Sequence, residues 1–293
     1  MNDPVFPPEA LLKLKSVYPQ SPVQLPHRLS GNPLLSLESL VRLASSLPAQ
    51  SVEYNLGNLP IGIAPENIPD SELSVVDTIR SIEENGSWMV LKRIEQRPDY
   101  KKLLMNTLAE IESLVSAKTG AMLGCEGFIF ISSPGAVTPF HFDPEHNILL
   151  QVRGEKVMTV FPANDEALIA PEAHEAFHMG EHHRNQIWRD EFVSKGTAIT
   201  LKQGEAIHMP VKAPHWVQNG QQVSISLSIT WRSEWSYAEA DARAFNRVLR
   251  KVGYRPTSPA PFPSHNMAKA LAYRVIRRTQ QSLSKTSVRG PSA

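Results

Sequence analysis

The spacing of apolar residues changes at about residue 127, and this change divides the chain. Before it, apolar positions recur every three or four residues, as on one face of a helix. From Gly127 to Trp231 they fall into short runs rich in β-branched and aromatic residues, separated by glycine, proline and asparagine. After Trp231 the helical period returns. The order predicts helices, then a series of strands, then helices again.

Three helices are expected before the strands. Ser36 is a candidate N-cap for a helix over 36–47. A second amphipathic stretch covers about 71–84. The clearest helix covers about 98–118, with Asp99 as a candidate cap and Gly120 at its exit. The first 35 residues hold prolines at 4, 7, 8, 19, 22, 26 and 33, a density that predicts an extended segment there.

The strand region contains seven β-prone runs, which are GFIFISS, VTPFHFD, NILLQV, KVMTVFP, TAITL, EAIHMP and VSISLSITW. Many short strands between turn signals are typical of a sandwich or barrel. QVRGEKV predicts a tight hairpin at Gly154. Residues 164–192, rich in histidine and glutamate, interrupt the series as an insertion, and helices are expected over about 237–252 and 267–283.

These elements predict a mainly β fold with flanking α-helices, in three parts. Residues 1–121 form a proline-rich segment and helices that pack on a barrel. Residues 122–235 form the barrel itself, with the insertion at 164–192. Residues 236–293 form a helical segment with a basic tail, because 267–293 contain no acidic residue.

Composition is that of a soluble globular protein, with 41% apolar and 20% charged residues. No apolar run approaches the roughly 20 residues of a spanning helix, and no secretory signal pattern is present, so we expect no membrane partner and a cytoplasmic location. The single cysteine, Cys125, excludes an internal disulfide and a cysteine-cluster metal site. A net charge of +1 argues against a nucleic-acid partner.

His141-Phe142-Asp143 carries the first chemistry, at the end of a β-prone run. Residues i and i+2 of a strand point to the same face, so both ligand-type side chains would project into the barrel. Two histidines and one carboxylate on one face of an octahedral ion leave positions open, as non-haem Fe(II) oxygenases require. His-x-Asp by itself is a common and weak signal.

A wider motif surrounds this pair. The sequence resembles the JmjC family of 2-oxoglutarate oxygenases over about 122–235, in TPFHFDPEHNILLQVRGEKVMTVFP, GEAIHMPVKAPHWVQNG and SISLSITW. The resemblance is closest to the branch of asparaginyl and other protein hydroxylases. It implies a double-stranded β-helix, the jelly-roll or cupin barrel, with N-terminal and C-terminal helices.

The resemblance also implies the site. Its iron ligands correspond to His141, Asp143 and His215, and its 2-oxoglutarate contacts to the residues Thr138, Asn147 and Lys156. The distal carboxylate of 2-oxoglutarate must be paired if it is buried. A lysine can supply the charge and a threonine hydroxyl a hydrogen bond, while the asparagine would hold the co-substrate near the iron.

Two ambiguities remain in the histidines. His208 lies in the apolar run EAIHMP, and His215 follows a proline-containing turn, which is where the family places its distal histidine; His215 is therefore preferred. His174, His178, His182 and His183 could bind zinc on a helix, but a polar insertion is favoured because no known motif completes the site. His146 is expected to be a partly exposed strand residue.

The resemblance implies an Fe(II)- and 2-oxoglutarate-dependent dioxygenase. It would use molecular oxygen to hydroxylate an unactivated C–H bond, with release of succinate and carbon dioxide. A protein or peptide side chain is the preferred substrate, a small metabolite or natural product is the main alternative, and demethylation of N-methyl-lysine ranks lower. A non-catalytic cupin-like metal-binding protein is the alternative from another class. The C-terminal helices could form a homodimer.

Overall fold

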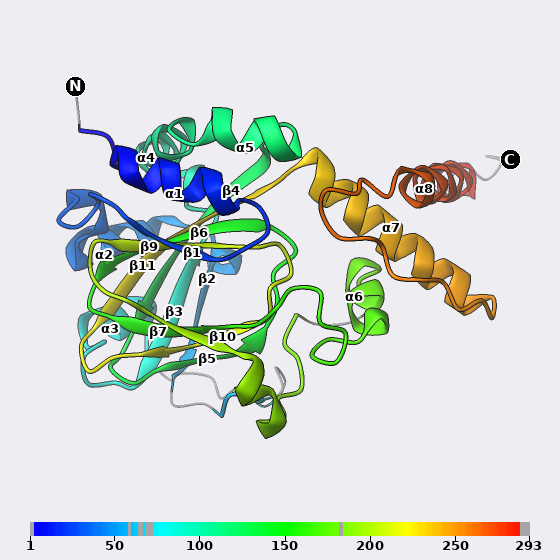
Figure 1. Cartoon of the computed structure of the whole chain (residues 1–293). Coiled ribbons are helices and arrows are strands. Elements are labelled where there is room, and N and C mark those ends of the chain that lie inside the picture. The colour runs from blue at the N-terminus through cyan, green and yellow to red at the C-terminus, as the bar shows by residue number, and fades with distance from the viewer. Residues whose placement is uncertain (1–2, 58–59, 64–66, 68–72, 182–183, 288–293) are drawn as a thin grey trace, which may run out of the picture. The chain divides into compact units, whose positions relative to one another are not determined.

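The computed structural model describes residues 3–57, 60–63, 67, 73–181 and 184–287, and the side chains up to residue 281 (Figure 1). Two antiparallel sheets form the barrel, with strand orders β1-β9-β6-β11-β4-β3-β2 and β5-β10-β7-β8. The strands are β1 Val23–Pro26, β2 Val52–Leu56, β3 Ser87–Lys92, β4 Leu123–Ser132, β5 Val137–His141, β6 His146–Arg153, β7 Lys156–Val160, β8 Thr197–Leu201, β9 Glu205–Met209, β10 His215–Asn219 and β11 Ser224–Arg232. The predicted jelly-roll cupin fold is confirmed.

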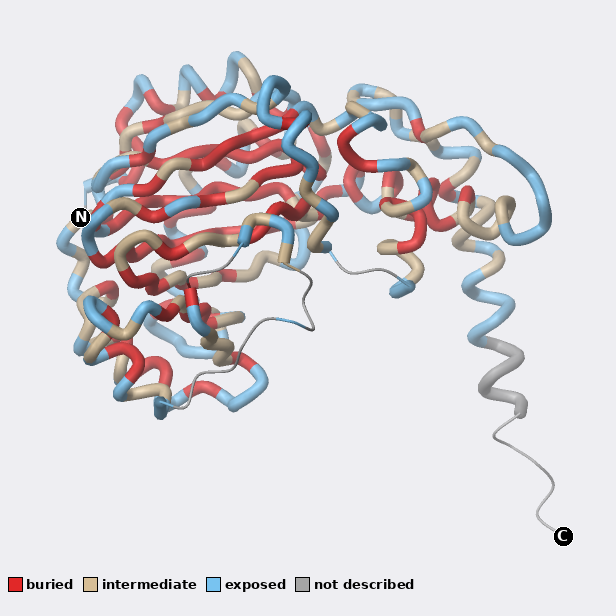
Figure 2. Tube along the Cα trace, turned by 90° about the horizontal axis from the view of Figure 1, so that it is seen from below, coloured by how far each residue is buried: buried red, intermediate tan, exposed pale blue. Residues whose placement is uncertain are grey.

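The central strands β6 and β11 of the seven-stranded sheet are buried on both faces (Figure 2). On β11, Ile225, Leu227 and Ile229 belong to the core beneath the helices. The serines between them lie on the opposite face, which looks toward the four-stranded sheet, because successive strand residues alternate. A second apolar cluster, which includes Leu149 and Val217, fills the space between the two sheets. Polar side chains on this inner face are therefore enclosed by the barrel.

Helices cover the outer face of the large sheet. They are α1 Pro8–Val17, α2 Leu37–Ser46, α3 Val75–Arg80, α4 Pro98–Ala109 and α5 Glu112–Thr119. Figure 1 shows α1, α4 and α5 together over this face, where they share one hydrophobic core with the sheet. Ser36 caps α2 by accepting a hydrogen bond from the backbone N–H of Ser39, as predicted. The second predicted stretch is shorter, and its Ser71 lies outside the described residues.

The prediction of an extended N-terminal segment is wrong, because α1 occupies part of it. Pro7 is the N-cap and Pro8 the first helical residue, positions where a missing N–H costs nothing. No proline follows until Pro19, which leaves room for three turns that bury Ala10 and Leu14. Strands β1, β2 and β3 were also missed, and each extends the large sheet.

The helix predicted over 98–118 is divided into α4 and α5. Glu110 lies at the break, where its carboxylate accepts hydrogen bonds from the backbone N–H groups of Val5 (2.7 Å) and Phe6 (2.8 Å). This tie holds the N-terminal segment on the helices. Asp99 makes no cap; Arg97 is the N-cap, with Pro98 in the first turn. Gly120 ends α5 with a φ of 81°, as predicted.

The predicted hairpin at Gly154 is a crossing between sheets. β6 pairs with β9 and β11, whereas β7 pairs with β8 and β10. Gly154 has a φ of 69°, and a Cβ there would lie 2.5 Å from the carbonyl oxygen of Val223. A glycine is therefore required where the chain passes from one wall of the barrel to the other.

Two compact units are present. One consists of Met1–Asp165 and Arg184–Ser233, and the other of Glu166–His183 and Glu234–Ala293. The second unit holds α6 Pro171–His178, α7 Glu234–Lys251 and α8 Met267–Ser287. Arg250 of α7 pairs with the buried Glu175 of α6 at 2.6 Å, and Arg274 of α8 with Asp241 of α7 at 2.6 Å. None of the described helices is long and apolar enough to cross a membrane.

Candidate metal and co-substrate site

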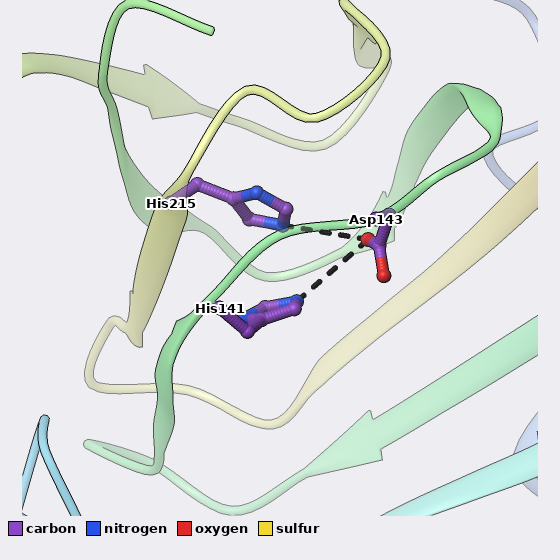
Figure 3. A group of neighbouring side chains, drawn as sticks. All are labelled: His141, Asp143 and His215. Atoms are coloured by element: carbon purple, nitrogen blue, oxygen red, sulfur yellow. Dashed lines mark ion pairs between the residues drawn. The ribbon is translucent and has the colours of Figure 1, made fainter. Parts of the chain in front are cut away.

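Three ligand-type side chains meet inside the barrel (Figure 3). His141 ends β5, Asp143 follows it in the next loop, and His215 begins β10. One ligand atom from each lies within 4.8 Å of the other two. Asp143 Oδ2 is 3.7 Å from Nε2 of His141 and 3.8 Å from Nε2 of His215. Strand pairing creates this meeting, because β5 and β10 are neighbours and His215 is the cross-strand partner of His141.

Both histidines have the orientation that a metal ion needs. Nδ1 of His141 lies 2.7 Å from the carbonyl oxygen of Pro139, and Nδ1 of His215 lies 2.9 Å from that of Ala213. A carbonyl only accepts, so each Nδ1 carries the proton and each Nε2 lone pair faces Asp143. Burial, together with the neighbouring His215 ring, lowers the pKa of His141 to about 3. The His141 imidazole is thus neutral at pH 7.

Asp143 is oriented from its other side. Arg184 Nη1 donates to Oδ1 at 2.9 Å, which leaves Oδ2 for the histidines. The backbone N–H of Lys212 donates to the carbonyl oxygen of Asp143 at 2.8 Å and holds the loop. Burial opposes ionisation of Asp143, but the nearby His141 and Arg184 hold its pKa below its usual value. A single carboxylate oxygen and two imidazole nitrogens can hold a divalent first-row ion and leave coordination positions open.

The predicted co-substrate residues lie on the same inner face. On β10, His215, Val217 and Asn219 alternate with outward residues, and Val217 belongs to the cluster between the sheets. Direct cross-strand partners share a face, so Thr138, opposite Val217, and Lys156, opposite Asn219, also face inward. An irregularity in the register between His215 and Val217 lets β5 present Thr138 and His141 to the same side.

Lys156 is buried without a counter-ion. Its side chain makes no hydrogen bond and no ion pair with any described residue, and the residue is 4% exposed. Burial alone lowers the pKa of its ammonium group from 10.5 to about 7. An uncompensated ammonium inside a barrel fits an anionic group that arrives with a ligand.

The comparisons with known proteins identify the family. Residues 74–237, more than half of the chain, match the family described as the cupin-like domain. The chain belongs to the cupin-like family. This agrees with the JmjC-type resemblance seen in its motifs.

Relatives of this cupin-like protein differ in how much they share with it. The lysine-specific demethylase JMJ30 of Arabidopsis thaliana is 30% identical over 105 residues, which cover 34% of this chain and 24% of that protein. The X-ray structure of E. coli ycfD superposes with a TM-score of 0.52 at 16% identity and covers 90% of this chain and 66% of that one. A second structure, of the Escherichia coli ribosomal oxygenase YcfD, gives 0.45 at 14% identity, covering 87% and 62%. The ycfD likeness at 0.52 supports the shared fold.

The cupin barrel contains further polar residues that sequence reasoning missed. Ser228 Oγ donates to Oδ1 of the predicted residue Asn147 at 3.1 Å, across the paired strands β11 and β6. The alternation of serine with isoleucine and leucine in SISLSITW was the signal that could have indicated it. Arg184 had no such signal, because its contact with Asp143 joins segments far apart in the sequence.

His208 points away from the cupin interior. It alternates with Ile207, which belongs to the inner cluster, and therefore faces the helices. There its ring lies 5.1 Å from that of Tyr18, and Nδ1 is 3.2 Å from the carbonyl oxygen of Ser21. His146 lies in the same layer, stacked on Trp231 at 5.4 Å. The expectation that His146 is partly exposed is wrong, since it is fully buried.

Three aromatic residues and the histidines of the insertion lie in other surroundings. Phe140, Trp188 and Trp216 meet edge to face on the outer side of the small sheet, opposite His141 and His215. Within the described part of the chain, the only group of three or more metal-ligating side chains is His141, Asp143 and His215. His174 and His178 lie on α6 and form no such group, whereas His182 and His183 lie outside the described residues.

Proposed function

We propose that this cupin-like protein is an Fe(II)- and 2-oxoglutarate-dependent oxygenase that hydroxylates an unactivated C–H bond. One observation carries the proposal. Two histidines, each held by a backbone carbonyl at Nδ1, and one carboxylate oxygen converge inside a barrel. The same inner face of that barrel holds the buried Lys156, which has no counter-ion among the described residues. A buried ammonium group is costly unless a ligand supplies its counter-charge, as the distal carboxylate of 2-oxoglutarate would.

The roles of the residues follow from their chemistry. His141, Asp143 and His215 would hold the iron, which when bound supplies the oxidising chemistry with molecular oxygen. Lys156 would pair with the distal carboxylate of 2-oxoglutarate, and the Thr138 hydroxyl would donate to it. Asn147, fixed by Ser228, would direct its amide N–H groups at the end of the co-substrate near the metal.

The overall reaction balances without another reductant. 2-Oxoglutarate, oxygen and the substrate C–H give succinate, carbon dioxide and the C–OH product. Decarboxylation supplies two of the four electrons that reduce oxygen, and the C–H bond supplies the other two. The barrel contributes by orienting the co-substrate and excluding water from the site.

The substrate class is the finer part of the proposal. A protein or peptide side chain is preferred, on the resemblance of the motif to protein hydroxylases. The main alternative is a small metabolite or natural product, and demethylation of N-methyl-lysine ranks below both. Mass spectrometry of cell extract treated with the wild-type protein or His141→Ala should find a species one oxygen heavier in the first only. If the modified species is a small molecule and not a peptide, the small-metabolite alternative replaces the protein substrate as the preferred one.

The test of activity is direct. Purified protein with Fe(II), ascorbate and 2-oxoglutarate should form succinate, and should show a 2-oxoglutarate-dependent thermal shift that requires metal. His141→Ala should lose metal binding, whereas Lys156→Ala should keep metal but bind 2-oxoglutarate weakly. If the wild-type protein forms no succinate and shows no such thermal shift, the result favours the non-catalytic cupin-like protein.

Two broader expectations stay predictions. Homodimerisation through the late helices is consistent with Met267, Leu271 and Val275, which recur every four residues on α8 and are exposed. Light scattering measures the oligomeric state. The cytoplasmic location is likewise a prediction, to be checked by fractionation.

A further inference from the structure

Asn219 has a buried acceptor without a partner. Its Nδ2 donates to the carbonyl oxygen of Ala136 at 2.9 Å, and its backbone N–H donates to the same oxygen at 2.9 Å. Reversing the amide would place two acceptors together, so the bond to Ala136 fixes which atom is oxygen. Oδ1 is thereby directed away from Ala136, is buried, and accepts no hydrogen bond from any described residue.

Lys156 is the neighbour that could satisfy this oxygen. It is the direct cross-strand partner of Asn219, and both side chains lie on the inner face. On the opposite side its partner in β8 is the apolar, fully buried Leu201. Burial is the sole cause of the lowered pKa of Lys156, so no charged group among the described residues lies close enough to shift it. An unpaired ammonium thus lies beside an unpaired amide oxygen.

We propose that Asn219 is a positioning residue for Lys156, accepting one ammonium N–H and directing the others at the carboxylate of a bound dicarboxylate such as 2-oxoglutarate. The inference deepens the proposed function and rests on it. Asn219 Oδ1 is an acceptor, so it cannot bind a carboxylate itself and must act through a donor. Its bond to Ala136 fixes its direction, and a fixed ammonium selects the length of the keto acid.

Binding rather than turnover tests this role. Calorimetry with Mn(II) measures affinity for 2-oxoglutarate, and pyruvate, a keto acid without the distal carboxylate, measures the contribution of the metal end. Asn219→Leu should weaken 2-oxoglutarate binding about tenfold, the size of a lost hydrogen bond to a charged group, and leave pyruvate unchanged. Gln218→Leu is the matched control, because the same change falls on an exposed residue of the same strand.

The pH profile separates positioning from a structural role. Binding should be lost as pH rises and Lys156 loses its proton. Because Asn219→Leu removes an acceptor that stabilises the ammonium, this loss should occur at a lower pH than in the wild type. Asn219→Asp should move that loss to a higher pH, because its carboxylate keeps Lys156 protonated, although it weakens affinity by repelling the ligand. A purely structural role would give no opposite shifts. If Asn219→Leu does not melt cooperatively, the smaller Asn219→Ala should give the same direction.

The possible failures are distinguishable. Wild-type protein that does not bind 2-oxoglutarate, or binds it equally well as Lys156→Met, would overturn the proposed function of the site. Wild-type binding that depends on Lys156, but is unchanged in affinity and pH profile by Asn219→Leu, would overturn this inference alone.

Discussion

His215 begins β10 directly opposite His141, which ends β5, and the ring centroids of the two histidines lie 4.2 Å apart. The pairing register therefore builds the candidate metal site. A slip of one residue would turn one ring to the outside of the barrel. The same register places Lys156 opposite Asn219, so the candidate metal ligands and the candidate co-substrate residues depend on one set of strand pairs.

The choice between the two candidate histidines can be tested by metal titration. His215→Ala should lower Mn(II) affinity by at least about 100-fold. Loss of a metal ligand should weaken metal binding at least as much as loss of a residue that only orients a ligand. His208→Ala should keep the affinity and instead lower stability, since His208 packs behind the sheet against Tyr18. Equal loss of affinity in both variants would contradict the assignment.

Lys156 should make the stability of the metal-free protein depend on pH. Its pKa is about 7 when folded and near 10.5 when exposed, so between these values the unfolded chain binds more protons and stability rises with pH. Lys156→Met should stabilise by several kcal/mol at pH 6, at roughly 1.4 kcal/mol per pKa unit, and by much less near pH 10. Urea unfolding measures both. The exposed Lys202→Met is the control; a gain independent of pH would refute the explanation.

Arg184 should support metal binding without supporting the fold. Arg184→Met frees Asp143 Oδ1 and should lower Mn(II) affinity by about 10-fold, while Arg184→Lys restores part of it. The Arg184 side chain is 53% exposed, so the melting temperature should change little. Arg189→Met, on the same segment, should leave affinity intact. Unchanged affinity in Arg184→Met would show that Asp143 is held by its backbone alone.

Gly154 should tolerate no side chain. Gly154→Ala combines a left-handed φ with a Cβ 2.5 Å from the Val223 carbonyl oxygen. We expect the free energy of unfolding to fall by well more than the ~1 kcal/mol that the backbone conformation alone costs. Gly86→Ala supplies that reference, because its φ is 62° and a Cβ there meets no atom within 4 Å. Chemical denaturation compares them. Similar losses of stability in the two variants would mean that the backbone at Gly154 shifts to accommodate the Cβ.

The strand runs of the barrel were predictable because each is a local pattern. Alternation in SISLSITW and the turn signals between runs extend over only a few residues, and the seven runs correspond to β4 through β9 and to β11. β10, which begins at His215, was not among them. The N-terminal strands were missed for the opposite reason. β1, β2 and β3 are short pieces among helices, and only their pairing with the edges of the large sheet makes them strands.

The sequence by itself determined which residue types could hold a metal and where along the chain they fall. The tertiary structure decided which of them meet. His208 and His215 are both flanked by apolar residues and proline, but only strand pairing turns one inward, and only pairing places Asn219 beside Lys156. It also groups residues 166–183 with the C-terminal helices, through ion pairs such as Arg250–Glu175. The periodicity of a sequence predicts which face of its element a residue occupies. Which residue lies next to it on that face depends on the pairing of strands that are distant in the sequence.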